Sequence, residues 1–283
     1  MFTEQLPASV CSSLDKINRQ FIWGGEEGKS SFHPIVWDQM VVPRSQGGAD
    51  IRPTRLANQA MLAKGAWKLA TNDQALWVRI MKGKYGQSRE GLDILKNTKG
   101  SSFAWRSFSH STDLLRKGCA YNIKNGKKAK FWTDVWLMQV PLNSVATQTI
   151  PEEFLQRRVA HYWHEDHGWK IDELADYLGA ETLETIQAFH FDPMTREEDK
   201  LRWNLTTNGS FTTRIAYQAL SPPLVPSKSA TFWKSIWKLH VPERVRVFIW
   251  MAVENKLTTK NIRKFRHLTT DDSCPYCENQ RRI

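Results

Sequence analysis

Cysteine is scarce in this sequence, and long apolar runs are missing. The 283 residues include four cysteines, of which only Cys274 and Cys277 lie close together. Four are too few for a disulfide-stabilised scaffold, which favours a reducing compartment. No apolar stretch approaches the about 20 residues that span a bilayer, and no secretory signal is visible at the N-terminus. We therefore expect an intracellular protein, nuclear or cytoplasmic, and neither a secreted nor a membrane protein.

The motifs of common catalytic sites are also missing. The sequence has no G-x-x-x-x-G-K-[ST] or G-x-G-x-x-G phosphate loop and no G-x-S-x-G nucleophile elbow. The adjacent aspartates Asp271 and Asp272 lie in a polar turn, with no apolar strand to hold two metal-binding carboxylates. His161, His164 and His167 would spread too widely on a helix or strand to bind one metal, which favours a polar loop. We expect no catalytic residues, no enzymatic activity of this chain alone and no small-molecule substrate.

Positive charge is abundant and unevenly distributed. The formal net charge is +11. Residues 1–139 carry 21 Lys and Arg against 11 Asp and Glu, residues 140–200 carry 5 against 13, and residues 201–283 carry 14 against 5. The two basic segments could face a polyanion, because each neutralised phosphate releases counter-ions. Alternatively, the acidic middle segment could fold back onto its basic neighbours.

Thirteen tryptophans supply large apolar surfaces, and core packing is their expected role. Apolar residues at helical spacing predict helices over residues 10–21, 54–70 and 242–252. The pairs Asn125-Gly126 and Asn208-Gly209 predict β-hairpins, because both residue types tolerate the positive φ of a type I′ turn. The predicted class is α+β and mainly α, with short helices, two β-hairpins and a C-terminal incomplete zinc-knuckle module.

Two groups of cations are candidates for contact with nucleic-acid phosphates. The first surrounds the first predicted hairpin and contains Lys124, Lys127, Lys128 and Lys130. The second lies near the predicted C-terminal helices and contains Arg244, Arg246, Arg263, Lys264 and Arg266. Charge alone does not identify the partner, and these clusters give no reason to expect a membrane.

The close cysteine pair, Cys274-Pro275-Tyr276-Cys277, predicts metal binding. A C-x-x-C turn directs two thiolates to one point, and structural zinc needs four ligands. No Cys or His follows Cys277 in this sequence. The spacing favours half of a zinc site, with Cys274 and Cys277 as metal ligands. A plain turn with two thiols and a redox pair are the alternatives.

Several short motifs occur in a fixed order along nearly the whole chain. They include residues 21–25 (Phe-Ile-Trp-Gly-Gly), 43–48 (Pro-Arg-Ser-Gln-Gly-Gly), 58–64 (Asn-Gln-Ala-Met-Leu-Ala-Lys), 131–136 (Phe-Trp-Thr-Asp-Val-Trp) and 274–277 (Cys-Pro-Tyr-Cys). The first three resemble the region after the polymerase domain in plant non-LTR (LINE-type) retrotransposon reverse transcriptases. The fourth resembles that family's F-W-x-D-x-W element, and the fifth its reverse-transcriptase zinc-binding domain.

Charge and resemblance together divide the chain into three segments. Residues 1–139 would be a helical connection region with a basic hairpin, 140–207 an acidic middle segment and strand, and 208–283 a truncated zinc-binding-like domain. In the family, a polymerase domain precedes this region, and a His and a Cys follow the C-P-x-C motif, so we expect a fragment. The resemblance implies a non-catalytic accessory role in reverse transcription, with nucleic acid as partner. A structural or protein-interaction module and a non-functional relic are the alternatives.

Overall fold

The computed structural model describes residues 3–24, 33–86, 89–96, 99–223, 229–265, 267 and 269–271. Its helices and two small two-stranded sheets confirm the predicted mainly α, α+β class. Among these residues, no helix is long and apolar enough to cross a membrane. The chain forms two compact units: unit 1 is Met1–Leu6 with Leu56–Pro222, and unit 2 is Pro7–Arg55 with Pro223–Ile283.

The two units divide the chain differently from the three segments expected from charge and resemblance. Residues 1–139 and 208–283 each contribute to both units, whereas 140–207 lies inside unit 1. The units are defined by packing and the three segments by sequence character. The three segments therefore stay a prediction about the family's organisation.

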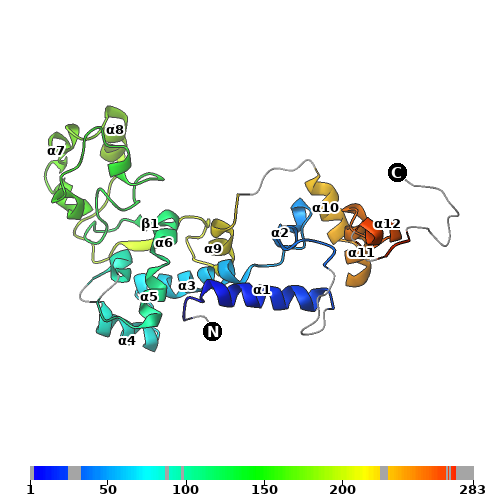
Figure 1. Cartoon of the computed structure of the whole chain (residues 1–283). Helices are drawn as coiled ribbons and strands as arrows, with labels where there is room; N and C mark the ends of the chain where they lie inside the picture. The colour runs from blue at the N-terminus through cyan, green and yellow to red at the C-terminus, as the bar shows by residue number, and fades with distance from the viewer. Residues whose placement is uncertain are drawn as a thin grey trace. The chain divides into compact units, whose positions relative to one another are not determined.

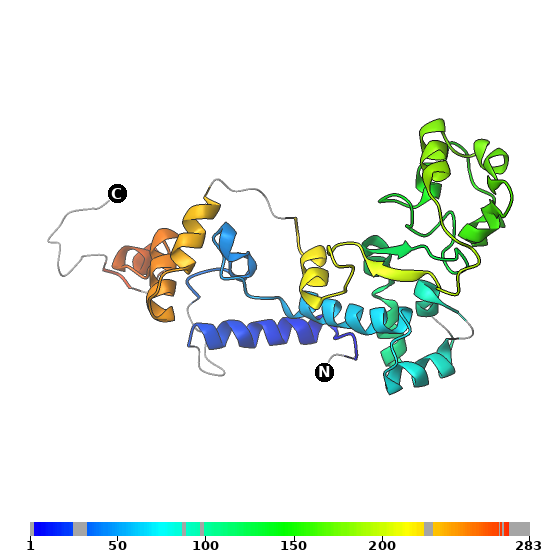
Figure 2. The ribbon, with the colours of Figure 1, turned by 180° about the vertical axis from the view of Figure 1, so that it is seen from behind.

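Unit 1 contains short helices and all four strands (Figures 1 and 2). Its helices are α3 (Thr54–Ala70, whose first two residues belong to unit 2), α4 (Leu76–Tyr85), α5 (Phe103–Ser109), α6 (Thr112–Gly118), α7 (Ile171–Ala175), α8 (Ala180–Ala188) and α9 (Thr213–Leu220). Its strands are β1 (Cys119–Asn122), β2 (Trp163–His164), β3 (Gly168–Trp169) and β4 (Lys200–Trp203). Four 3₁₀ helices complete it: η2 (Gly91–Leu95), η3 (Leu142–Ser144), η4 (Phe154–Gln156) and η5 (Val159–Tyr162).

The first core of unit 1 lies among α3, α5, α6 and β4. Apolar residues of α3, such as Leu62 and Leu69, are almost fully buried there. Trp203 of β4 is fully buried, and a Cβ added at Gly118 would lie 2.3 Å from its ring. Glycine at the end of α6 thus lets the indole approach the backbone, which a larger residue would prevent.

The second core of unit 1 is aromatic and contains the F-W-x-D-x-W motif. Phe131, Trp132 and Trp136 are buried together with Tyr162 and Trp169. The indole Nε1 of Trp132 donates a hydrogen bond of 2.8 Å to the Tyr162 hydroxyl, which satisfies the polar edge of a buried ring. Helices α7 and α8 pack on this core. The prediction that tryptophans mainly build cores is correct for this motif.

The strand pairing differs from the two predicted hairpins. β1 pairs antiparallel with the distant β4, with Cys119 opposite Trp203 and Asn122 opposite Lys200. The residues after the Asn125-Gly126 turn form no strand that pairs with β1. The Asn208-Gly209 turn does form, with Gly209 at φ +71°, and the Gly209 carbonyl accepts from the Trp203 N–H at 2.7 Å. After this turn the chain enters α9 and forms no strand paired with β4. Both hairpin predictions are therefore wrong.

A short hairpin does form where the histidine run predicted a polar loop. β2 and β3 pair antiparallel with Trp163 opposite Trp169, and His164 lies in β2. The His164 and His167 rings stack with centroids 5.0 Å apart. The two tryptophans anchor this hairpin on the aromatic core, which explains why a polar-looking stretch holds two strands.

Unit 2 combines an N-terminal segment with three C-terminal helices (Figures 1 and 2). Its elements are α1 (Ala8–Ile22), α2 (Trp37–Val41), the 3₁₀ helix η1 (Arg44–Gln46), α10 (Ala230–Trp237), α11 (Glu243–Val253) and α12 (Lys260–Phe265). Its core contains Ile35 and Met40 from the N-terminal segment with Trp237 and Trp250 from α10 and α11. The two distant parts of the chain therefore share one core.

Candidate nucleic-acid interface

A loop of residues 123–130, which we name the basic loop, follows β1 in unit 1. One buried carboxylate, Asp199, holds its backbone: Oδ1 accepts from the N–H groups of Lys124 (2.8 Å) and Gly126 (2.9 Å). Oδ2 accepts from those of Lys128 (2.8 Å) and Ala129 (3.2 Å). Because these four donors point at Asp199, they are not available for a strand ladder, which explains the missing first hairpin.

Two of the lysines predicted to bind phosphate, Lys124 and Lys128, form ion pairs with exposed glutamates. Lys124 lies 3.0 Å from Glu197, and Lys128 lies 2.7 Å from Glu198 and 3.8 Å from Glu90. A hydrogen bond from Lys124, together with its positive charge, lowers the pKa of Glu197 below the usual value. The acidic middle segment thus does fold back onto part of the basic one, as the alternative interpretation of the charge pattern expected.

The remaining two lysines of the basic loop differ from this pair and from each other. Lys130 has a side chain only 9% exposed and lies 2.5 Å from Asp93, so it is part of the interior. Lys127 forms no ion pair with any residue that the structure describes. The four predicted residues are brought into one loop, but they are not four free cations.

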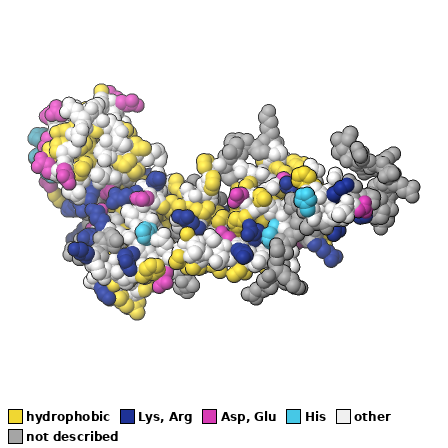
Figure 3. Space-filling view, in the orientation of Figure 1, with side chains coloured by type: hydrophobic (Ala, Val, Ile, Leu, Met, Phe, Trp, Pro, Cys, Tyr) yellow, Lys and Arg dark blue, Asp and Glu magenta, His cyan; other side chains and the backbone are white. Residues whose placement is uncertain are grey.

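A groove beside the basic loop gathers three lysines from different elements. It has a volume of about 380 Å³ and is lined by Lys82 of α4, Lys128, and Lys200 of β4, together with Glu90 and Glu198. Figure 3 shows Lys and Arg side chains interspersed with carboxylates across this part of unit 1, between the α7–α8 region and the α4–α5 region. The lining thus contains three lysines and three carboxylates, because the neutral N–H groups that bind Asp199 cancel none of its charge.

Polar groups at the end of α3 extend the same groove. Thr71 and Asn72 line it, and Lys82 Nζ donates a 3.0 Å hydrogen bond to Asn72 Oδ1. Burial lowers the pKa of Lys82, the carboxylate of Glu90 opposes this shift, and the positive charge of Lys128 adds to it. An oxyanion beside Lys82 would favour the charged ammonium, as Glu90 does.

Lys82 and Lys200 were not among the residues predicted from the sequence. Lys82 lies on the helix α4 near Arg79 and Lys84, and Lys200 lies at the edge of the acidic segment, two residues before Arg202. Only the pairing of β1 with β4 brings Lys200 beside the basic loop. The acidic run Glu197–Asp199 next to a strand was the available signal, but it does not say which loop it contacts.

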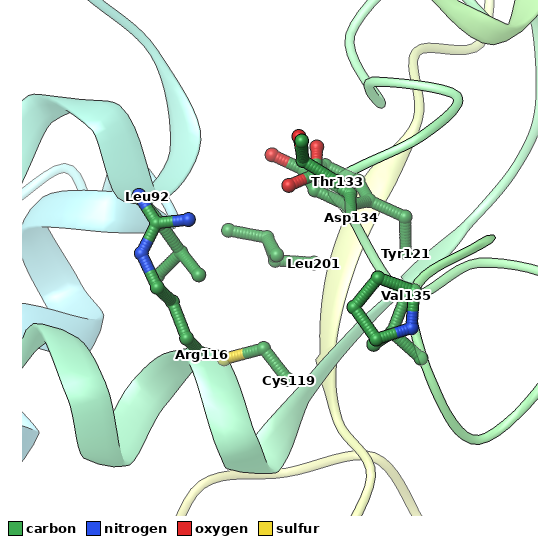
Figure 4. Close-up of a pocket in the computed structure, with 9 residues that line it drawn as sticks. Leu92, Arg116, Cys119, Tyr121, Thr133, Asp134, Val135 and Leu201 are labelled. Carbon is green, nitrogen blue, oxygen red and sulfur yellow. The ribbon is translucent and has the colours of Figure 1, made fainter. Parts of the chain in front are cut away.

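A second, smaller pocket shares Tyr121 and Leu201 with the lining of the groove. It has a volume of about 130 Å³, and Figure 4 shows Arg116 on one wall facing Thr133 and Asp134. The Asp134 carboxylate accepts a 2.8 Å hydrogen bond from the Lys130 backbone N–H, and burial raises its pKa. Asp93 and Asp134 are therefore both held by Lys130. In the described part of the chain, no three His, Cys, Asp or Glu side chains are grouped closely enough to bind a metal.

The second predicted group of cations belongs to unit 2. Arg244 on α11 and Arg263 on α12 are exposed. Arg246 contacts Glu243 and donates to the Leu239 carbonyl at 2.8 Å, so it holds the start of α11 in place. Lys264 lies on α12, and Arg266 lies outside the described residues.

In unit 2, residues 33–51 pack against α10 and α11. The Trp250 indole donates a 2.7 Å hydrogen bond to the Gly47 carbonyl, and a Cβ at Gly47 would lie 2.9 Å from the Trp233 ring. The guanidinium of Arg44 lies 4.5 Å from the centre of the Trp237 ring. Gly47 also has φ +90°, which side chains rarely adopt. The Pro-Arg-Ser-Gln-Gly-Gly motif thus has a structural role as the partner of these two helices.

The predicted metal ligands Cys274 and Cys277 lie outside the described residues. The other two cysteines, Cys11 and Cys119, are buried and form no disulfide. Burial strongly raises the pKa of Cys119, so this thiol stays protonated and is a poor metal ligand.

Residues 211–282 match the family described as zinc-binding in reverse transcriptase. This part of the chain is similar to the zinc-binding domain of reverse transcriptases. The match includes α9 to α12 and the C-x-x-C pair. The chain as a whole is similar to a protein of Arabidopsis thaliana named "putative ribonuclease H protein", with 29% identity over 98% of this chain and 45% of that relative. It therefore spans about half the length of that relative.

A second relative covers a shorter stretch. The "uncharacterized mitochondrial protein" of Arabidopsis thaliana is 28% identical over 49% of this chain and 90% of its own length. No solved structure matches the chain significantly. The family match and the two plant relatives confirm the resemblance to plant retroelement reverse transcriptases.

Proposed function

We propose that this chain is a non-catalytic accessory part of a retroelement reverse transcriptase and that it binds RNA or DNA. The observation that carries the proposal is the groove of unit 1, in which Lys82, Lys128 and Lys200 meet. Three ammonium groups from separate elements can contact phosphates without reading bases. The zinc-binding domain of a polymerase that copies RNA supports a nucleic-acid partner.

Binding should depend on salt in a way that reports phosphate contacts. For single-stranded RNA, three contacts predict a slope of log K against log salt of roughly −2, because each contributes about −0.7. Fluorescence anisotropy with a labelled oligo-uridylate across a salt series measures this slope. A slope near zero would eliminate phosphate contact as the basis of binding.

Removing two groove cations should weaken this dependence. Lys82→Gln with Lys200→Gln is expected to reduce the magnitude of the slope by about 1.4. The matched control is Lys64→Gln with Lys99→Gln, which removes the same charge from exposed positions of unit 1 that do not line the groove. Equal effects of the two pairs would show that net charge, and not the groove, determines binding.

A structural or protein-interaction module is the second candidate function. The observation in its favour is the pairing of Lys124 and Lys128 with carboxylates of the acidic segment. Reversing the charges of Lys127 and Lys128 to Glu separates the two functions. The nucleic-acid proposal expects RNA affinity to fall while unfolding is little changed, whereas a scaffold would lose stability and keep its RNA affinity.

We also propose that Cys274 and Cys277 bind zinc. Two thiolates supply half of the tetrahedral ligand set of structural zinc. For the 283-residue polypeptide we therefore expect less than one tightly bound zinc per chain unless two chains share an ion. Metal analysis after dialysis measures this. A tight one-to-one complex that survives Cys274→Ser would contradict the assignment.

A further inference from the structure

Three consecutive carboxylates precede β4, and they have different roles. Asp199 is buried and accepts four backbone N–H groups of the basic loop. Glu197 and Glu198 have side chains 59% and 64% exposed, and each contacts one lysine of the same loop. Asp199 therefore fixes the loop, while the two glutamates only occupy its ammonium groups.

The lysines stay in position when their carboxylate partners leave. The Lys124 and Lys128 backbones are held by Asp199, independently of Glu197 and Glu198. Exposed ion pairs of this kind are weak and exchange readily. An ammonium group donates to a phosphate oxygen with much the same contact geometry as to a carboxylate oxygen.

One of the two glutamates lies where a strand in the groove would run. Glu198 and Lys128 both line the groove, which continues to Lys82 and Lys200. Lys124 lies outside the groove lining but on the same loop as Lys128, and it is paired with Glu197. A chain of phosphates following the lysines of the groove would meet Glu198, and one that continued to Lys124 would meet Glu197.

We propose that the groove and the basic loop bind successive phosphates of one nucleic-acid strand, and that Glu197 and Glu198 are internal competitors which the strand displaces. This inference rests on the proposed function and adds which carboxylates the nucleic-acid strand displaces when it binds. In the free protein, Lys124 and Lys128 contact carboxylates. In the complex they contact phosphates, and the glutamate side chains turn into solvent.

The test is the removal of the competitors without any change to the lysines. Glu197→Gln with Glu198→Gln should tighten binding of a labelled oligo-uridylate roughly 10-fold at about 0.1 M salt and leave the salt slope nearly unchanged, because the same lysines contact phosphates in both complexes. The matched control is Glu181→Gln with Glu184→Gln on α8. These exposed residues carry the same charge and form no ion pair among the described residues. Because screening limits charge effects to about 10 Å, the control should change binding less than about 2-fold.

A double-mutant cycle tests whether the effect of the glutamate substitutions on binding depends on Lys124 and Lys128. With Lys124→Gln and Lys128→Gln already present, the two glutamate substitutions should no longer tighten binding. Equal effects of the groove and control pairs, or an effect that persists without the lysines, would overturn the inference. If the wild type binds with a clear salt slope and the glutamate substitutions change nothing, only this inference fails. If neither protein binds, the proposed function fails with it.

Discussion

Asp199→Ala is expected to destabilise unit 1 by about 3–4 kcal/mol. The substitution removes the acceptor of four backbone N–H groups, of which those of Gly126 and Ala129 are buried. Water can replace part of this carboxylate, but buried donors without a partner keep their full desolvation cost. Urea denaturation followed by tryptophan fluorescence measures the loss, since the aromatic core next to the loop contains Trp132 and Trp136.

Two further variants make the Asp199 prediction specific. Asp192→Ala removes an exposed carboxylate that accepts a single N–H, from Met194 at 2.9 Å, and should cost less than about 1 kcal/mol. Asp199→Asn keeps the shape and one acceptor oxygen but places an NH₂ group against two donors, so an intermediate loss is expected. Equal stability of Asp199→Ala and Asp192→Ala would contradict the role that we give to Asp199.

The family-matched segment, residues 211–282, is expected not to fold cooperatively when expressed alone. Its first residues belong to unit 1, where the Phe211 ring stacks on Trp67 at 5.6 Å and contacts Trp203 at 4.8 Å. Helices α10 and α11 would lose buried Ile35 and Met40. They would expose apolar surface that normally packs in a shared core, and such loss is strongly destabilising. Thermal unfolding and amide dispersion in NMR spectra, with zinc present, test this.

A second fragment supplies the control for this prediction. Residues 33–55 joined by a flexible linker to 223–283 contain the whole shared core of α2, α10 and α11 with the Gly47 carbonyl that Trp250 binds. This fragment should recover a cooperative transition. Cooperative unfolding of 211–282 alone would show that residues 33–51 are dispensable for the zinc-binding domain.

Helices were predictable from the sequence because their signals are local. Apolar spacing predicted residues 54–70, which are the bounds of α3, and residues 242–252, which differ from α11 by one residue at each end. Residues 10–21 likewise lie inside α1. In each case, residues three and four positions apart share a face, and that information is contained in a short window.

Strand pairing and the two units were not predictable, since they depend on distant partners. The Asn-Gly pairs correctly indicate positive φ at Gly126 and Gly209. Whether a strand returns after such a turn depends on the acceptor that its N–H groups meet, and here Asp199 is that acceptor. Likewise, nothing in residues 33–51 alone shows that α10 and α11 are their partners.

Cationic residues were easy to find in the sequence, but their burial and ion pairing were not predictable from it. Lys127 and Lys130 look alike in the basic loop, yet one forms no ion pair in the described structure and the other is buried against Asp93. Lys82 and Lys200 have cationic neighbours such as Lys84 and Arg202, but nothing in the sequence shows that the two lysines line one groove. Burial and ion pairing follow from tertiary contacts, so a count of charges can suggest a polyanion partner without locating where it binds.

Because Asn122 pairs with Lys200, the chain between these residues starts and ends at one residue pair of the β1–β4 ladder. Its aromatic core is largely its own, while the helical core is built from residues on either side. Such a module could be deleted, replaced by a tight turn or exchanged for another during evolution without disturbing the helices that carry it. Length variation among related elements should accordingly concentrate between residues 123 and 199.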